Sequence, residues 1–240
     1  QTQSYTNTYG EDNDYSINAP NYTDNGNGTI SDINTNLMWQ KQDDATSLNW
    51  SDAKTYCTNL SLGGYSDWRL PEAYELQSIV DYGIYNSSVD TAYFPETQTS
   101  KPYWAISINI SSSSEAWYTS FYSGSVGYKS QGYSNYVRCV RGAQIESSYT
   151  NNNNGTILDH KTGMIWQQQG DGIIKTTWEL ALSYCENLVL NSMSDWRLPN
   201  IKELNTIVDY STSNPTINTT FFTNAISSHY WSSTTNVEVT

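Results

Sequence analysis

The sequence is poor in charged residues, and the charges that it carries are mostly negative. Asp, Glu, Lys and Arg make up only 15% of the 240 residues, and 24 acidic against 11 basic residues give a net charge of -13. Proteins bind nucleic acids and anionic membrane surfaces through clustered Lys and Arg. We therefore expect no nucleic-acid partner, and the acidity also disfavours a sulfated polysaccharide as ligand.

Long apolar runs and histidines are scarce as well. No run approaches the roughly 20 apolar residues of a membrane-spanning helix, so we expect no membrane span. The only histidines are His160 and His229, and no catalytic constellation is recognisable around either of them. The sequence therefore predicts a protein that is not an enzyme and needs no cofactor.

Uncharged polar and aromatic residues are abundant instead. Tyr (20) and Trp (9) are far too frequent for a disordered chain. A surface of hydroxyl and amide groups with few charges is common in secreted and cell-surface proteins, so we expect an extracellular location.

Most of the sequence occurs twice. Asp67-Trp68-Arg69-Leu70-Pro71 returns as the same pentapeptide at 195–199, and the matches continue along the chain at an offset of 127 or 128 residues. This spacing indicates two tandem domains rather than a short-period repeat. We expect an N-terminal polar leader or strand at 1–22, a first domain at 23–143, a linker at 144–152, and a second, incomplete domain at 153–240.

Each copy predicts two helices followed by short strands. In copy one, Asn49 is a candidate N-cap, and Trp50, Ala53 and Cys57 fall on one helical face. A second helix follows Pro71. Strands are predicted at 103–110, 116–122 and 136–140, separated by Ser- and Gly-rich turns. This order predicts an α+β fold with a small antiparallel sheet in each domain.

The three cysteines leave two alternatives open. Cys57 and Cys139 lie at the start and the end of copy one and could form a disulfide, which indicates an oxidising compartment. Cys185 matches Cys57, and its partner would lie beyond Thr240. The alternative is three buried free thiols.

The repeated pentapeptide carries an Asp-Arg pair beside a Trp, which we expect to be a structural network rather than a site. A nearby glutamate of each copy could join it, because Arg favours bidentate carboxylate partners. The residues of this network are Asp67, Trp68 and Arg69, and Asp195, Trp196 and Arg197.

Two sets of residues are candidates for binding. The Asn- and Gly-rich turn near Asp24 and Asp32 imitates part of a calcium loop, but it lacks most of the carboxylates, so calcium is a weak expectation and a plain turn the better one. Aromatic residues among Ser and Gly suit stacking on sugar rings or packing against another protein. The candidate ligand-binding residues are Trp117, Tyr118, Tyr122, Tyr128 and Tyr133.

The ordered motifs resemble a known family. Gly-Thr-Ile, Trp-Gln, Trp-x-x-Ala-x-x-Tyr-Cys, Asp-Trp-Arg-Leu-Pro-x-x-x-Glu-Leu, Tyr-Trp and Val-Arg-Cys-Val-Arg resemble the C-terminal domain of the Legionella collagen-like protein. The resemblance implies a C-type lectin-like fold, a disulfide between Cys57 and Cys139, and adhesion or recognition outside the cell. The Arg-Leu-Pro segment is also similar to one in formylglycine-generating enzymes, which share that fold.

Two functions of different kinds follow as expectations. The first is recognition or adhesion, with a glycan or a surface protein as partner. The second is a structural subunit of an extracellular filament, in which copies of the chain assemble through the N-terminal segment and the domain edges. An enzyme like those that generate formylglycine is a distant third.

Overall fold

A computed structural model describes residues 20–144, 147–170, 172 and 177–235. The chain is α+β and divides into two compact units, whose boundary in the sequence lies between Ala143 and Gln144. Most of the predicted N-terminal segment 1–22 lies outside the described residues. No helix in the described ranges is long and apolar enough to cross a lipid bilayer.

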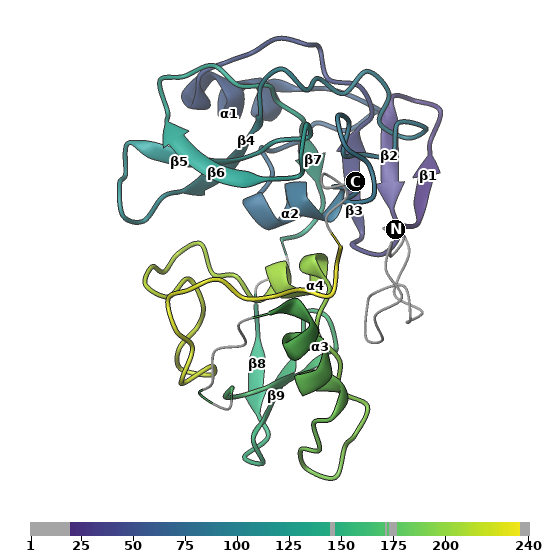
Figure 1. Ribbon diagram of the computed structural model, residues 1–240. Helices are drawn as coiled ribbons and strands as arrows, with labels where there is room; N and C mark the ends of the chain where they lie inside the picture. The colour runs from purple at the N-terminus through teal and green to yellow at the C-terminus, as the bar shows by residue number, and fades with distance from the viewer. Residues whose placement is uncertain (1–19, 145–146, 171, 173–176, 236–240) are drawn as a thin grey trace. The chain divides into compact units, whose positions relative to one another are not determined.

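The first unit contains two antiparallel sheets (Figure 1). One has the strand order β1-β2-β3-β7, and its interior positions Ile30, Trp39 and Val140 are fully buried. The other has the order β4-β5-β6. The strands of the first sheet are β1 (Tyr22–Asp24), β2 (Thr29–Asp32), β3 (Leu37–Gln40) and β7 (Val140–Arg141), and those of the second are β4 (Tyr103–Ile108), β5 (Glu115–Thr119) and β6 (Val126–Ser130).

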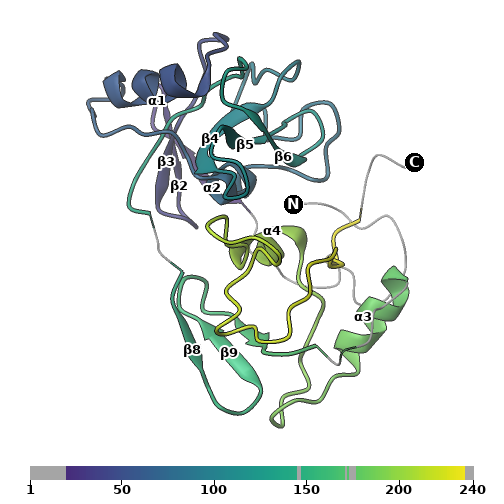
Figure 2. The ribbon, with the colours of Figure 1, turned by 90° about the vertical axis from the view of Figure 1, so that its left-hand side faces the viewer.

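Two helices pack on the β4-β5-β6 sheet (Figure 2). Helix α1 (Trp50–Asn59) begins at the predicted cap, because the Asn49 side chain accepts a hydrogen bond from Asp52 N. Its apolar face joins Trp104 and Ala116 in the main core. Helix α2 (Ala73–Ser78) begins just after Pro71, and Ala73 N donates to Ser107 Oγ of β4. The sheet is therefore fixed to both helices.

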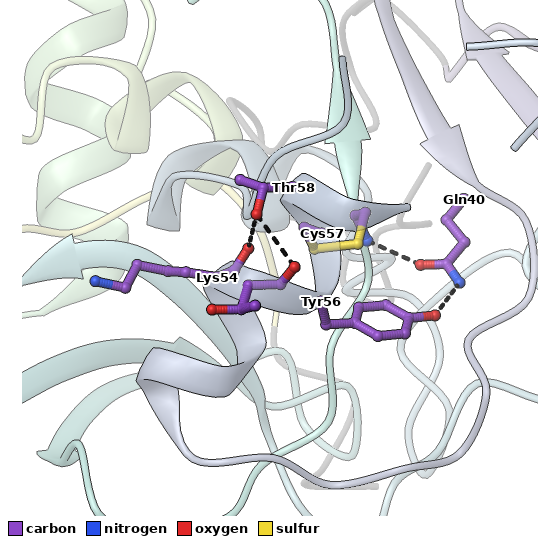
Figure 3. The surroundings of a disulfide bond; sticks show 7 residues. Gln40, Lys54, Tyr56, Cys57 and Thr58 are labelled. Carbon is purple, nitrogen blue, oxygen red and sulfur yellow. Dashed lines mark hydrogen bonds between the residues drawn. A yellow bond between two sulfur atoms is a disulfide. The ribbon is translucent and has the colours of Figure 1, made fainter. Parts of the chain in front are cut away.

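A disulfide between Cys57 of α1 and Cys139, next to β7, joins the early and late parts of the first unit (Figure 3). It spans 82 residues, and both cysteines are fully buried. Gln40 of β3 fastens the same place, because its Oε1 accepts from Cys139 N at 3.1 Å and its Nε2 donates to Tyr56 Oη at 3.1 Å. Helix α1, strand β3 and the segment that leads into β7 are thus held together at one point.

The Asp-Trp-Arg-Leu-Pro network differs from the expected pairing. Arg69 does not pair with Asp67 but forms two hydrogen bonds with Glu75 of α2, at 2.7 and 2.6 Å. Asp67 instead accepts two from Arg141 of β7, at 2.7 and 2.9 Å. Arg69 is therefore tied to helix α2, and Asp67 to strand β7. Trp68 between them is buried.

Two strand predictions also need correction. The stretch 136–140 was expected to be a strand, but only Val140–Arg141 is regular, because the residues before it bond in turn to Leu48, Pro102 and Trp104. The sequence pattern missed β6, whose exposed, polar residues resemble a turn.

The second unit repeats the order of the first within the described residues. A sheet of order β10-β9-β8 precedes two helices. Arg197 and Glu203 repeat the Arg69–Glu75 pair at the same 2.7 and 2.6 Å, whereas Asp195 is exposed and Trp196 only half-buried. The elements are β8 (Tyr149–Asn151), β9 (Thr156–Asp159), β10 (Ile165–Gln167), α3 (Trp178–Glu186) and α4 (Ile201–Thr206).

Strand β8 occupies part of the predicted linker 144–152. The Tyr149 ring packs on Phe221 and Phe222, with centroids 5.4 and 5.5 Å away. Tyr22 of β1 makes the equivalent contacts with Tyr93 and Phe94, both at 5.3 Å. Both repeats therefore pack a tyrosine of their first strand against the same pair of aromatic positions.

Removing the disulfide should destabilise the first unit strongly. For a loop of 82 residues, the chain-entropy model gives roughly 4 kcal/mol. We expect the double variant Cys57→Ser, Cys139→Ser to show a much lower urea midpoint than the wild type. Cys185→Ser is the matched control and should leave that transition in place. A double variant as stable as the wild type would contradict the prediction.

Candidate functional site

The aromatic residues predicted to bind a ligand lie in three different places of the first unit. Trp117 and Tyr128 are directly opposite each other on β5 and β6, with ring centroids 5.2 Å apart in an edge-to-face arrangement. Tyr128 is 51% exposed, and Trp117 is half-buried. The two form an aromatic platform on one face of the β4-β5-β6 sheet.

Tyr118 lies on the opposite face of the sheet, which it shares with Trp104 and Ala116. Its ring crosses β6 at Gly127, where an added Cβ would stand only 2.6 Å from the Tyr118 hydroxyl. A glycine is therefore required at 127 for the ring to lie flat across the strand. Tyr133, which is 63% exposed, flanks the same region.

Lys129 of β6 projects onto this second face. Its Nζ lies 5.4 Å from the Tyr118 ring centroid, 5.5 Å from that of Tyr133 and 5.9 Å from that of Trp104. Partial burial, and then the positive charge of Lys101, lower the pKa of Lys129. We call Lys129, Tyr118 and Tyr133 the Lys129 face.

Tyr122 occupies a third place, in the turn that follows β5. Its ring contacts Tyr85 with centroids 5.0 Å apart, and it is exposed. The five aromatic residues, which are close together in the sequence, therefore lie on two sheet faces and in a turn. They do not form one continuous site.

An open groove of about 450 Å³ runs along α1. Its walls combine the Tyr56 ring and apolar side chains with carboxylate, amide and hydroxyl groups, a mixture that suits polar ligands with an apolar face. Leu48 in its wall is fixed to the sheet, because Leu48 O accepts from Trp104 Nε1 at 2.9 Å. The groove is lined by Leu48, Asp52, Thr55, Tyr56, Asn59, Leu60 and Ser61.

A buried ionic cluster surrounds Arg138, which is fully buried. Its guanidinium donates to the backbone oxygens of Gln40 and Lys41, at 2.8 and 2.6 Å. It also donates to Thr97 Oγ1 at 2.8 Å and to the Asp43 carboxylate at 3.3 Å. The cluster is closed to solvent, so it serves the fold rather than a ligand.

Tyr103 completes this cluster from the sheet. Its hydroxyl donates to Asp43 Oδ2, and burial raises the pKa of Tyr103, which keeps the phenol protonated. The Arg138 guanidinium lies 5.1 Å from the Phe94 ring centroid and 5.8 Å from that of Tyr103. Buried charges in proteins are tolerated when they are paired and hydrogen-bonded in this way.

The two weak calcium candidates are engaged elsewhere. Asp24 Oδ2 accepts from Lys41 Nζ at 2.6 Å, which lowers the pKa of this carboxyl. Asp32 accepts backbone hydrogen bonds in its own turn, from Asn34 N at 3.0 Å. No group of three or more His, Cys, Asp or Glu in the described ranges could hold a metal ion. Calcium binding here stays an untested prediction.

Sequence reasoning missed the residues that matter most at these places, namely Lys129 and Arg138. The alternation in Val126–Ser130 would have placed Lys129 on the same face as Gly127, but the strand itself was not recognised. Arg138 interrupts the apolar run that leads to Cys139, which is a signal for a buried, paired charge.

These features define a disulfide-tied α+β domain that occurs twice in tandem. The chain matches the Lcl C-terminal domain over residues 28–141 and again over 155–240, and it therefore belongs to this family. It is a family of binding domains of secreted or surface proteins. No curated protein matches the chain.

Asp43→Asn should destabilise the first unit by about 3 kcal/mol, because it leaves the Arg138 charge buried without its counter-ion. Asp67→Asn is the matched control, since it also removes an aspartate partner of an arginine. Asp67 is 62% exposed and Asp43 only 2%, so the control should shift the urea midpoint far less. Equal shifts in urea denaturation of the full chain would contradict a role for burial.

Proposed function

We propose that the chain is a secreted, non-enzymatic recognition protein that binds glycans through exposed aromatic side chains of its first unit. The observation that supports this most is the pair of partly exposed aromatic faces on β5 and β6, carried by Trp117 and Tyr128 on one side and by Tyr118 and Tyr133 on the other. Planar rings held rigidly beside hydroxyl groups suit stacking on the apolar faces of sugar rings.

The fold that carries these faces is, in this proposal, C-type lectin-like. The disulfide between the first helix and the segment before the final strand, and the two helices packed on small sheets, support this assignment. Membership of the Lcl C-terminal domain family supports the extracellular location and the recognition role.

An enzyme like those that generate formylglycine has little support. Cys57 and Cys139 are bonded to each other, and a cysteine in a disulfide is not a nucleophile. The described residues also contain no metal-binding group that would activate a thiol.

A glycan array probed with the full chain tests the recognition function. The double variant Tyr128→Ala, Tyr133→Ala should weaken binding by roughly 3- to 10-fold per ring. Tyr230→Ala is the matched control, because Tyr230 is a tyrosine of the second unit with a comparable exposure of 55%. Binding that is absent from every glycan, or equal in the double variant and the control, would refute the proposal.

A second function, a subunit of an extracellular filament, is favoured by the low charge of the chain and by its two tandem copies. In the described ranges β1 and β8, the first strand of each copy, are edge strands of their sheets. An edge strand offers unpaired backbone groups to a second copy of the chain, and two such edges allow repeated contacts.

Negative-stain electron microscopy in physiological salt separates the two functions. Assembly predicts ordered fibres without any ligand, lost on deletion of residues 1–22 or in Thr150→Lys, which places a charge on the edge strand β8. Leu180→Lys, on helix α3 and 53% exposed, is a control for added charge away from a strand edge. Small separate particles of the wild-type chain would exclude the filament function and leave recognition.

A further inference from the structure

Lys129 places an ammonium group among aromatic rings without a negative charge from the chain beside it. Four cations of the first unit have carboxylate partners, as in the pairs Lys41–Asp24 and Arg138–Asp43. Within the described part of the chain, Lys129 Nζ has no carboxylate within 4 Å and no hydrogen-bond acceptor; its neighbours are the three rings. In a chain with 24 acidic residues, such a charge is conspicuous.

Lys101 adds a positive charge to the electrostatic surroundings of Lys129. Its Nζ donates to Ser47 Oγ at 2.9 Å, and its charge, after burial, contributes to the lowered pKa of Lys129. Like charges repel, and partial burial of Lys129 strengthens this repulsion. A bound anion would neutralise this repulsion and accept hydrogen bonds from the Lys129 ammonium, a charge-assisted interaction.

The rings around the ammonium indicate what carries the anion. Tyr133 is the most exposed of the five predicted ligand-binding aromatics, and Tyr118 lies flat across Gly127 with its hydroxyl at the edge of β6. Flat aromatic faces and phenol hydroxyls beside a cation fit a sugar ring that bears an acidic group. The separate groove along α1 offers amide, hydroxyl and carboxylate groups that suit uncharged sugars.

We propose that the Lys129 face binds the carboxylate of an acidic sugar residue within an otherwise weakly charged saccharide. The inference rests on the proposed glycan-binding function and names its ligand class and contact residues. A densely sulfated chain does not fit, because the face offers one ammonium group, that of Lys129, while the chain as a whole carries a net charge of -13 and repels polyanions. One carboxylate per binding site matches the available charge.

Calorimetric titration of the full chain with matched saccharides tests the proposal. Tri-galacturonate and its methyl ester share one skeleton and differ in charge, and 3′-sialyllactose and lactose form a second such pair. We expect the charged member of at least one pair to bind roughly 10-fold more tightly than its neutral partner, and this preference to shrink in 0.5 M NaCl.

Three variants locate the interaction. Lys129→Gln keeps most of the side-chain length but removes the charge, so it should abolish the preference for the charged saccharide. Tyr133→Ala should weaken both members of a pair, because it removes a stacking ring. Lys54→Gln is the control: Lys54 Nζ also lies over an aromatic ring, 3.7 Å from the Trp50 centroid, and its loss should change nothing. Unchanged thermal midpoints establish that each variant is folded.

The outcomes distinguish this inference from the function on which it rests. Equal binding of charged and neutral partners, or a wild-type preference in Lys129→Gln, overturns the Lys129 assignment. If neutral glycans still bind and the loss of Tyr128 weakens them, glycan recognition stands through the other sheet face. If neither pair binds, the acidic-sugar proposal fails, and the glycan array decides whether recognition of other sugars survives.

Discussion

The first unit depends on the covalent tie between α1 and the segment before β7. Cys57 and Cys139 bring together parts of the chain that are 82 residues apart, and Gln40 hydrogen-bonds both to the Cys139 backbone and to Tyr56. Beside this point, β7 pairs with β3 and also bonds to Arg69. The segment between the cysteines, which includes the β4-β5-β6 sheet, is therefore closed at both ends. Aromatic side chains on that sheet are held by a frame rather than by a free loop, which lowers the entropy lost when they bind.

Arg138 selects the register of this closure. It directly precedes Cys139, and its guanidinium has its acceptors only where the Gln40, Lys41 and Asp43 groups converge. A shift of the final segment by one residue would place Arg138 away from Asp43 and Val140 away from Trp39, and would leave a buried charge without a partner. The cost of such an unpaired charge, of the order of several kcal/mol, makes the observed register strongly preferred. The disulfide thus holds the final segment next to α1, and the buried Arg138 fixes its register against β3.

The sequence predicted the local structure well because local signals were strong. The Asn49 cap, the helical stripe with Cys57, the tandem repeat and the α+β order all follow from spacing and turn residues. Partners distant in sequence were less accessible. Asp67 meets Arg141, not Arg69, because a contact across 74 residues cannot be inferred from neighbours in the chain. Strand β6 was missed because its polar, half-exposed residues resemble a turn. Lys129 was missed for the same reason, and because the three aromatic rings around it come from β4, β5 and the segment after β6.

The buried dipeptide Tyr103-Trp104 shows how the frame and the proposed site are divided. Both residues are fully buried, and Trp104 lies in the core that contains Ala116 of β5 and Val137. The Lys129 face is built from β5, β6 and the residues that follow β6, on the same side of the sheet as that core. The motifs that recur in both copies maintain the core, whereas Lys129 and Tyr133 lie outside them. In the proposed function, recognition is therefore a property of the late strands, and the shared motifs maintain the frame on which those strands are displayed.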